Sequence, residues 1–148
     1  MIAEQMVSFD YDYVDFKVKK EDWNAYKLED GVSLKFKVVL IKVIKPKEER
    51  QGVPLAFATT NVLAVFSPKE LRGTPSGPTE GDYEIEKYDV SFETLREDWN
   101  EYELEDGRIL KIKPAISIIN KTKHFDRAGE PIYLVESNLL TKVLPPTT

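Results

Sequence analysis

The chain has 148 residues with 41% hydrophobic and 32% charged side chains, a formal net charge of −5 and no cysteine. The lack of cysteine excludes disulfides and thiolate chemistry, and no apolar run approaches the roughly 20 residues that a membrane-spanning helix needs. The acidic balance argues against nonspecific nucleic-acid binding, because that affinity comes largely from Lys and Arg displacing counterions from phosphates.

An eleven-residue block occurs twice in the sequence, at residues 21–31 and, almost unchanged, at residues 97–107. Matches extend on both sides of the block, with one inserted residue in the second copy, and cover residues 14–68 and 90–145. A Pro- and Gly-rich linker at residues 67–82 separates the copies. One copy of about 55 residues would bury only a marginal core. The sequence therefore predicts a tandem duplication, in which two fused repeats share one core in a single domain spanning residues 1–148.

The first ten residues contain no basic segment followed by an apolar one, so we predict no secretory signal and expect a cytoplasmic location. From Val7 aromatic and polar residues alternate as in a strand, and at Val14 the alternation changes parity, which predicts a bend at a barrel corner. The corresponding run of the second copy, residues 83–95, is predicted to bend in the same way. Asp22 is a suitable N-cap for one helical turn at most.

Two Asp-Gly pairs predict β-hairpins. Asp30-Gly31 and Asp106-Gly107 stand between extended flanks, and Asp and Gly tolerate the positive φ of a type I′ turn. Long strands are predicted at residues 34–45, 55–66, 109–121 and 132–144. The fold class is mainly β, a pseudo-two-fold closed barrel or sandwich of about six to eight strands with at most short helical turns. This organisation resembles the duplicated small barrels of the cradle-loop type.

Acidic and tryptophan side chains of the repeated block form the candidate site. Under a pseudo-two-fold they converge at the seam between the copies. The candidates are Asp22, Trp23, Glu29, Asp30, Asp98, Trp99, Glu105 and Asp106. The aspartic proteases carry an Asp two residues before a Gly in each half-barrel, whereas here the Asp directly precedes the Gly, which favours a turn role. The two tryptophans are also typical of core or staple positions.

Four lysines occupy equivalent positions on two predicted strands and could form a basic strip for an anionic partner. They are Lys35, Lys37, Lys111 and Lys113. Because no aromatic residue interleaves this strip on the predicted outer face, solvated lysines in cross-strand pairs are the favoured interpretation. The aspartates at positions 10, 12 and 15 lack the glycine and terminal Glu of an EF-hand loop, and His124 is the single histidine. We therefore predict no metal site and no cofactor.

The two copies differ in apolar content. Val39, Ile41 and Val43 of the first copy correspond to Ala115, Ser117 and Ile119 of the second. Monomers rarely expose large apolar patches, so this surplus predicts a contact with another chain. Our hypothesis is a noncatalytic binding or assembly module, homo-oligomeric through Val39, Ile41 and Val43, with a protein partner as a further possibility. The alternative is an enzyme or small-ligand-binding protein that uses the acidic seam.

Overall fold

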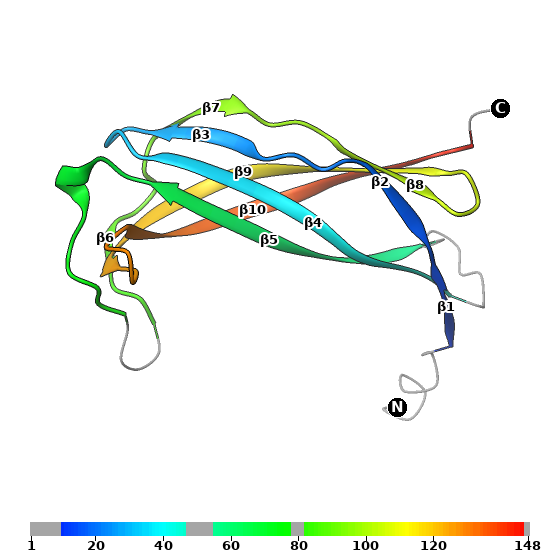
Figure 1. Ribbon diagram of the computed structural model, residues 1–148, viewed down its shortest axis with the longest axis horizontal. Helices are drawn as coiled ribbons and strands as arrows, with labels where there is room; N and C mark the ends of the chain where they lie inside the picture. Colours follow the sequence, from blue (N-terminus) through cyan, green and yellow to red (C-terminus); the bar gives the residue numbers. More distant parts are fainter. Residues whose placement is uncertain (1–9, 47–54, 78–81, 147–148) are drawn as a thin grey trace.

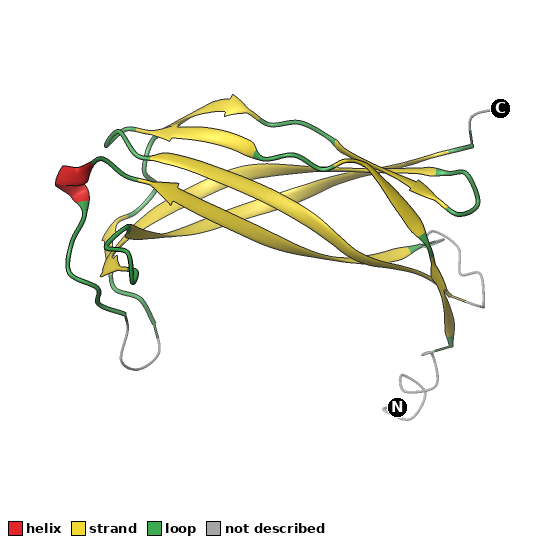
Figure 2. Ribbon diagram, in the orientation of Figure 1, coloured by secondary structure: helices red, strands yellow, loops and turns green. Residues whose placement is uncertain are grey.

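The computed structural model describes residues 10–46, 55–77 and 82–146. In this part of the chain ten strands form two antiparallel five-stranded sheets, and the only helix is the 3-10 turn η1 (Lys69–Leu71) (Figures 1 and 2). The mainly β prediction is confirmed. The closed barrel is wrong, because the sheets remain separate and pack on one another through a common set of buried side chains. No helix in the described segments is long and apolar enough to cross a membrane.

We call the two sheets A and B. Sheet A contains, in spatial order, β5 (Ala56–Phe66), β4 (Ser33–Pro46), β3 (Asn24–Leu28) and β7 (Phe92–Arg96), with β1 (Tyr11–Val14) beside the far end of β4. Sheet B contains β10 (Pro131–Leu144), β9 (Ile109–Phe125), β8 (Asn100–Leu104) and β2 (Phe16–Lys20), with β6 (Ile85–Lys87) beside the far end of β9. As a result β5 and β10 edge the two sheets on one side of the molecule, and β7 and β2 edge them on the other (Figure 1).

The first and second halves of the chain exchange strands. β1 pairs with β4 of its own half, but β2, which begins two residues after β1 ends, pairs with β8 in the other half. In return, β7 pairs with β3. The predicted bend at Val14 lies where the chain leaves sheet A for sheet B at Asp15. The predicted strand that precedes each copy of the repeated block therefore forms two strands, which explains why there are more strands than predicted.

Alternating side chains of the long strands fill the space between the sheets. Leu34, Phe36 and Val38 of β4 are buried, whereas the residues between them face outward. A bulge between Leu40 and Lys42 in the pairing with β5 then shifts the alternation by one residue. Ile41 still faces outward and is 52% exposed, whereas the shift turns Val43 inward, so that it is 1% exposed and belongs to the core. The predicted interface role of Val43 is therefore wrong.

Exposed apolar residues are not confined to the first half, contrary to the expected surplus. On β4 and β5 the large exposed ones are Ile41, Val62 and Phe66. On β10 they are Leu134, Leu139, Leu140, Val143 and Leu144. The sequence comparison was made between β4, which contains Val39 and Ile41, and β9, which contains Ala115 and Ser117. It therefore missed the exposed apolar residues of β10, the strand next to β9.

Both Asp-Gly pairs form hairpin turns, with φ of +90° at Gly31 and +89° at Gly107. The turns are of a different type from the one predicted. In the first hairpin Gly31 N–H donates to the Leu28 carbonyl and Leu28 N–H donates to the Val32 carbonyl, and Asp30 has no positive φ. These contacts describe a type I turn followed by a glycine bulge. The Asp30 carboxylate caps the turn by accepting from Val32 N–H at 3.1 Å.

The helical turn predicted at Asp22 is absent, since residues 21–23 connect β2 to β3 between the sheets. The predicted linker packs on the hairpin between β9 and β10. Gly73 N–H donates to the Gly129 carbonyl at 2.9 Å, and a Cβ at Gly73 would lie 2.6 Å from the ring of Phe125. Residues 78–81 of the linker, the repeat match at residues 52–54 and the predicted strand start at Val7 lie outside the described residues.

Candidate functional site

The repeated block places a buried hydrogen-bond network where the chain crosses between the sheets. Glu21, which begins the crossing from β2 to β3, accepts a 2.6 Å hydrogen bond from the Tyr102 hydroxyl and a 3.3 Å bond from Leu40 N–H. Tyr102 is fully buried. One carboxylate of the first half is thus held by a phenol of the second half.

The same arrangement recurs 76 positions later with the halves interchanged. Glu97 accepts a 2.7 Å hydrogen bond from the Tyr26 hydroxyl and a 3.2 Å bond from Ile116 N–H. Burial and the neighbouring carboxylate raise the pKa of both tyrosines far above the ordinary value. Next to them, buried Asn24 accepts from Asp98 N–H at 2.8 Å, and buried Asn100 donates to the Val38 carbonyl at 2.9 Å.

A tyrosine beside a carboxylate can transfer a proton, but such a pair must reach its substrate to act as an acid or base. Tyr26 and Tyr102 both have 0% exposure. Every buried polar side-chain atom in the described part of the chain has a hydrogen-bond partner. The network therefore connects the halves, and its two phenols are closed to solvent, while Glu21 and Glu97 are partly exposed.

Two of the predicted site residues, Asp22 and Asp98, do lie together on the surface of this crossing. Arg96 bridges them, with N–O distances of 3.1 Å to Asp22 and 3.6 Å to Asp98. Lys20 Nζ lies 2.6 Å from Asp98 Oδ2, and this hydrogen bond, with that from Trp99 N–H, holds the pKa of Asp98 below its usual range. Both carboxylates are thus paired with cations.

The other acidic candidates do not converge. The turn that carries Glu29 and Asp30 and the turn that carries Glu105 and Asp106 lie at opposite ends of the long axis (Figure 1). A site combining all of them, or a shared-proton pair of the aspartic-protease kind, is therefore wrong. The two crossings of the chain lie together, whereas the two turns lie apart.

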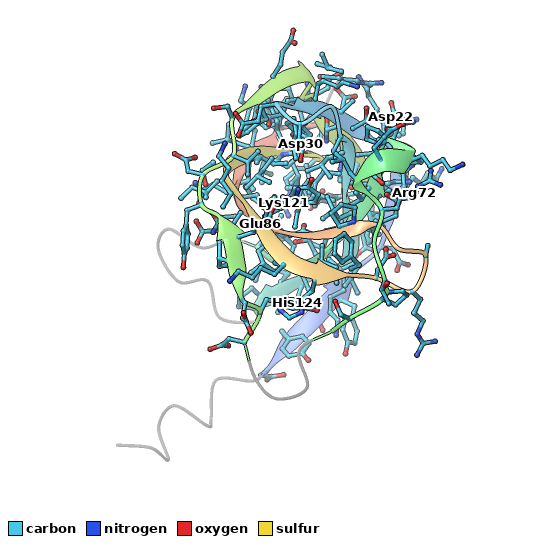
Figure 3. The ribbon with its side chains drawn as sticks, turned by 90° about the vertical axis from the view of Figure 1, so that its left-hand side faces the viewer. Asp22, Asp30, Arg72, Glu86, Lys121 and His124 are labelled. Carbon is cyan, nitrogen blue, oxygen red and sulfur yellow. The ribbon has the colours of Figure 1, made fainter. Side chains whose placement is uncertain are left out.

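At one end Asp30 joins the two sheets (Figure 3). Its Oδ2 accepts a 2.7 Å hydrogen bond from the Tyr133 hydroxyl and lies 3.9 Å from Lys121 Nζ, which in turn is 3.2 Å from Glu86. Burial and the hydrogen bond to Asp30 raise the pKa of Tyr133 strongly. Glu29 forms an ion pair with Lys87 beside this cluster.

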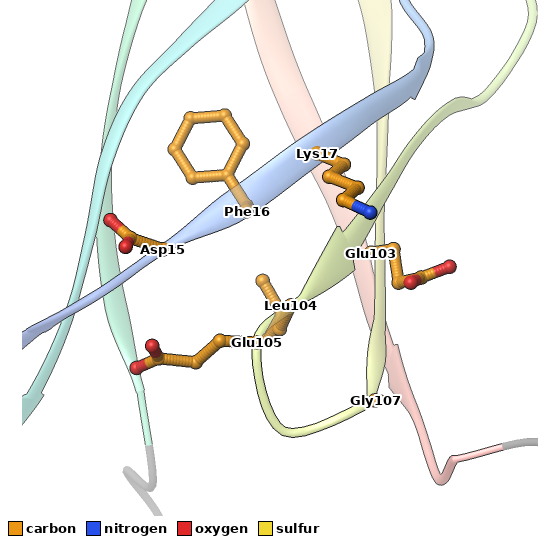
Figure 4. A pocket seen from close by; sticks show the side chains of 7 residues that line it. All are labelled: Asp15, Phe16, Lys17, Glu103, Leu104, Glu105 and Gly107. Carbon is orange, nitrogen blue, oxygen red and sulfur yellow. The ribbon is translucent and has the colours of Figure 1, made fainter.

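The corresponding cluster cannot form around Asp106 at the opposite end. In the first half of the chain, the residues that align with Lys121 and Tyr133 are Ile44 and Ala56, which are apolar. Asp106 pairs instead with Arg108 at 2.7 Å, and this contact lowers its pKa. A pocket of about 460 Å³ opens nearby between β2 and β8 (Figure 4). Its lining residues are Asp15, Phe16, Lys17, Glu103, Leu104, Glu105 and Gly107. Of the predicted site residues, it contains only Glu105.

Trp23 and Trp99 lie on the outer faces of the sheets, and the core interpretation of Trp23 is wrong, because its side chain is 38% exposed. Lys37 Nζ is 5.6 Å from the centre of the Trp23 ring. Lys113 and Lys142 lie 5.8 Å and 4.5 Å from the centre of the Trp99 ring. Lys37 and Lys113 of the strip therefore do have aromatic neighbours, which the sequence order concealed because these rings come from other segments of the chain.

His124 belongs to β9 and binds the linker. Its Nε2 accepts from Glu84 N–H at 3.1 Å, so Nδ1 is the protonated nitrogen and donates to the Ser76 carbonyl at 3.1 Å. Within the described residues no three His, Asp or Glu side chains are grouped in a way that could hold a metal ion.

The sequence interpretation missed Glu21, Tyr26 and Asn24 together with their counterparts Glu97, Tyr102 and Asn100. The signal was present, since all are identical in the two copies of the block. Polar residues that recur within a strand pattern indicate buried hydrogen bonds, because burying them unpaired is costly.

No model of a known protein family, no curated protein and no solved structure matches the chain.

Proposed function

We propose that the protein is a noncatalytic assembly module that binds a second copy of itself through the side of the molecule edged by β5 and β10. We call this the open side. One observation carries the proposal: on β10, side chains that point toward the space between the sheets are exposed. Leu139 and Val143 are 36% and 42% exposed.

The pairing register supports the inward direction of these side chains. Leu139 stands opposite Pro114 and Val143 opposite Leu110, and both of those β9 residues are buried. An inward-facing leucine is normally covered by a neighbouring strand or by the facing sheet. Because β10 pairs only with β9, and β5 only with β4, neither edge strand has a neighbour on the open side within the described residues.

Outward-facing residues of β10 add to this apolar surface. Leu140 is 48% exposed and Leu144 is 39% exposed. A long apolar edge strand is a template for pairing with another chain, and a charged edge side chain usually prevents this. On this half of β10 the only charged residue is Lys142, whose ammonium lies over the Trp99 ring on the outer face of the sheet.

The sequence of β10 suits pairing with itself. In an antiparallel pair centred on Thr141, Leu139 of one copy stands opposite Val143 of the other, and Leu140 stands opposite Lys142. Apolar residues then meet on the inner face without opposed like charges. A two-fold dimer uses the same patch on both subunits, so a self-complementary strand favours a second copy as the occupant.

Sedimentation velocity from micromolar to millimolar concentration tests the proposal. The wild type should sediment as a dimer or larger species, and Leu139→Lys should shift it to the monomer while its circular dichroism stays unchanged. Leu95→Lys is the matched control, because Leu95 is 57% exposed on the edge strand β7 at the opposite side.

Ile41→Lys separates this surface from the one predicted by sequence, where Val39 and Ile41 form the contact. Dissociation by Ile41→Lys without dissociation by Leu139→Lys would place the interface on the outer face of sheet A. A wild-type monomer throughout the concentration range would refute self-assembly.

We also propose that the two halves are copies of one ancestral unit that share a single core. The reciprocal contacts of the crossings support this, because Tyr26 with Glu97 and Tyr102 with Glu21 are the same pair with the halves interchanged. Aromatic contacts repeat likewise, with ring centres 5.8 Å apart for Phe16 and Tyr102 and 5.9 Å apart for Tyr26 and Phe92.

A further inference from the structure

The outer face of sheet A combines cations and exposed rings from three strands and from the connection between β2 and β3. Lys37 of β4 lies over Trp23, Lys35 of β4 lies 5.6 Å from the ring centre of Phe66, and Lys42 lies 5.7 Å from that of Tyr13. Phe66 and Tyr13 are 52% and 64% exposed. We call these six residues the Lys-aromatic face.

The lysines of this face lack carboxylate partners within the described part of the chain. The residue opposite Lys35 on β3 is Ala25, whereas the residue opposite the equivalent Lys111 on β8 is Glu101, which pairs with it at 3.0 Å. Neither β4 nor β5 contains an acidic residue. The outer face of sheet A at β4 and β5 is therefore locally positive on a chain whose net charge is −5.

The rings are distributed along β4. Phe66 stands opposite Ser33, Trp23 precedes the residue opposite Phe36, and Tyr13 stands opposite Ile44. At about 3.3 Å per residue, these positions cover about 35 Å of the strand. A folded protein partner would favour a flat apolar patch, whereas rings that alternate with unpaired cations along a strand suit a flexible polyanion with aromatic units.

We propose that the Lys-aromatic face binds single-stranded nucleic acid, with bases stacked on Trp23, Phe66 and Tyr13 and phosphates held by the neighbouring lysines. Bases stack on aromatic side chains irrespective of sequence, and Lys next to the ring neutralises the phosphate of the same nucleotide. The overall acidic charge disfavours binding to any polyanion at random, and a positive face confines the contact to one surface. The Lys-aromatic face is the outer face of sheet A and shares Phe66 of the edge strand β5 with the open side, but the proposal does not depend on self-assembly.

Fluorescence anisotropy with fluorescein-labelled oligo(dT) and oligo(U) of about 20 nucleotides tests it at low salt. Trp23→Ala should weaken binding about tenfold, since one stacking platform is lost. Lys37→Ala should weaken binding and reduce the slope of log K against log salt concentration by about one unit. Trp99→Ala is the matched control, because Trp99 is the equivalent residue on sheet B, and it should bind as the wild type does.

Three outcomes would overturn the proposal. The first is no binding at low salt, and the second is an equal loss with Trp23→Ala and Trp99→Ala. The third is a preference for heparin over oligo(dT) with no effect of Trp23→Ala, which would indicate binding of a polyanion without base stacking. Binding retained in monomeric Leu139→Lys would show that this activity stands apart from assembly.

Discussion

The hydroxyl of Tyr26 donates a 2.7 Å hydrogen bond to Oε2 of Glu97, which lies 71 residues further along the chain. Tyr26 is completely buried, so water does not reach its hydroxyl. Together with the reciprocal pair, it joins the two halves at the points where each strand leaves its own sheet.

Tyr26→Phe should lower the free energy of unfolding by about 1.5–3 kcal/mol, because it leaves a partly buried carboxylate short of one charge-assisted hydrogen bond. Urea unfolding followed by circular dichroism measures the change. Tyr88→Phe is the control, since Tyr88 is 71% exposed, and it should have little effect. Equal stability of the two variants would show that the Tyr26 bond contributes nothing net.

Stability should decline when the pH rises above about 10, the ordinary pKa of tyrosine. The folded protein raises the pKa of Tyr26, Tyr102 and Tyr133, so the unfolded chain loses protons first. Their contribution is present in full below pH 10 and is lost as the pH increases beyond it. Absorbance at 295 nm should show three of the seven tyrosines ionising only together with unfolding. Ionisation of all seven in the folded state would contradict the buried phenols.

Replacing the turn glycines should be costly. Gly31→Ala and Gly107→Ala each force a side chain into positive φ, which should cost about 1 kcal/mol or more. The cost should be greater at Gly107, where a Cβ would lie 3.2 Å from Pro146, than at Gly31, where the nearest atom is 3.6 Å away. Denaturant unfolding measures both, and Gly77→Ala, with open space around the Cβ, is the control that should be neutral.

A chain ending at residue 73 should not fold. It retains β2 without β8 and β3 without β7, and its Glu21 and Tyr26 lose the hydrogen bonds to Tyr102 and Glu97. We expect an unfolded or aggregated product by circular dichroism and gel filtration, and a single cooperative transition for the full chain. A stable, monomeric first half, or two separate transitions in the full chain, would indicate that the halves fold independently.

The turns and the extent of the long strands could be predicted from the sequence, but the pairing of strands distant in the sequence could not. The turns at Gly31 and Gly107 follow from Asp-Gly, and the extent of β4 follows from its alternation. The exchange of β2 and β7 could not be predicted, because a break at Asp15 does not indicate which sheet the next strand joins.

The bulge after Leu40 hid the burial of Val43, since one extra residue reverses the direction of every later side chain. The convergence of Lys37 on Trp23 depends on the pairing of two strands and was therefore hidden too.

The strand exchange also determines when each sheet can be completed during translation. Residues leave the ribosome in order, so β4 and β5 emerge with their apolar faces while sheet A still lacks β7 and sheet B does not exist. At about 5–20 residues per second, the second half takes several seconds to be translated. For that time the nascent first half exposes unpaired apolar strands, and such surface favours aggregation.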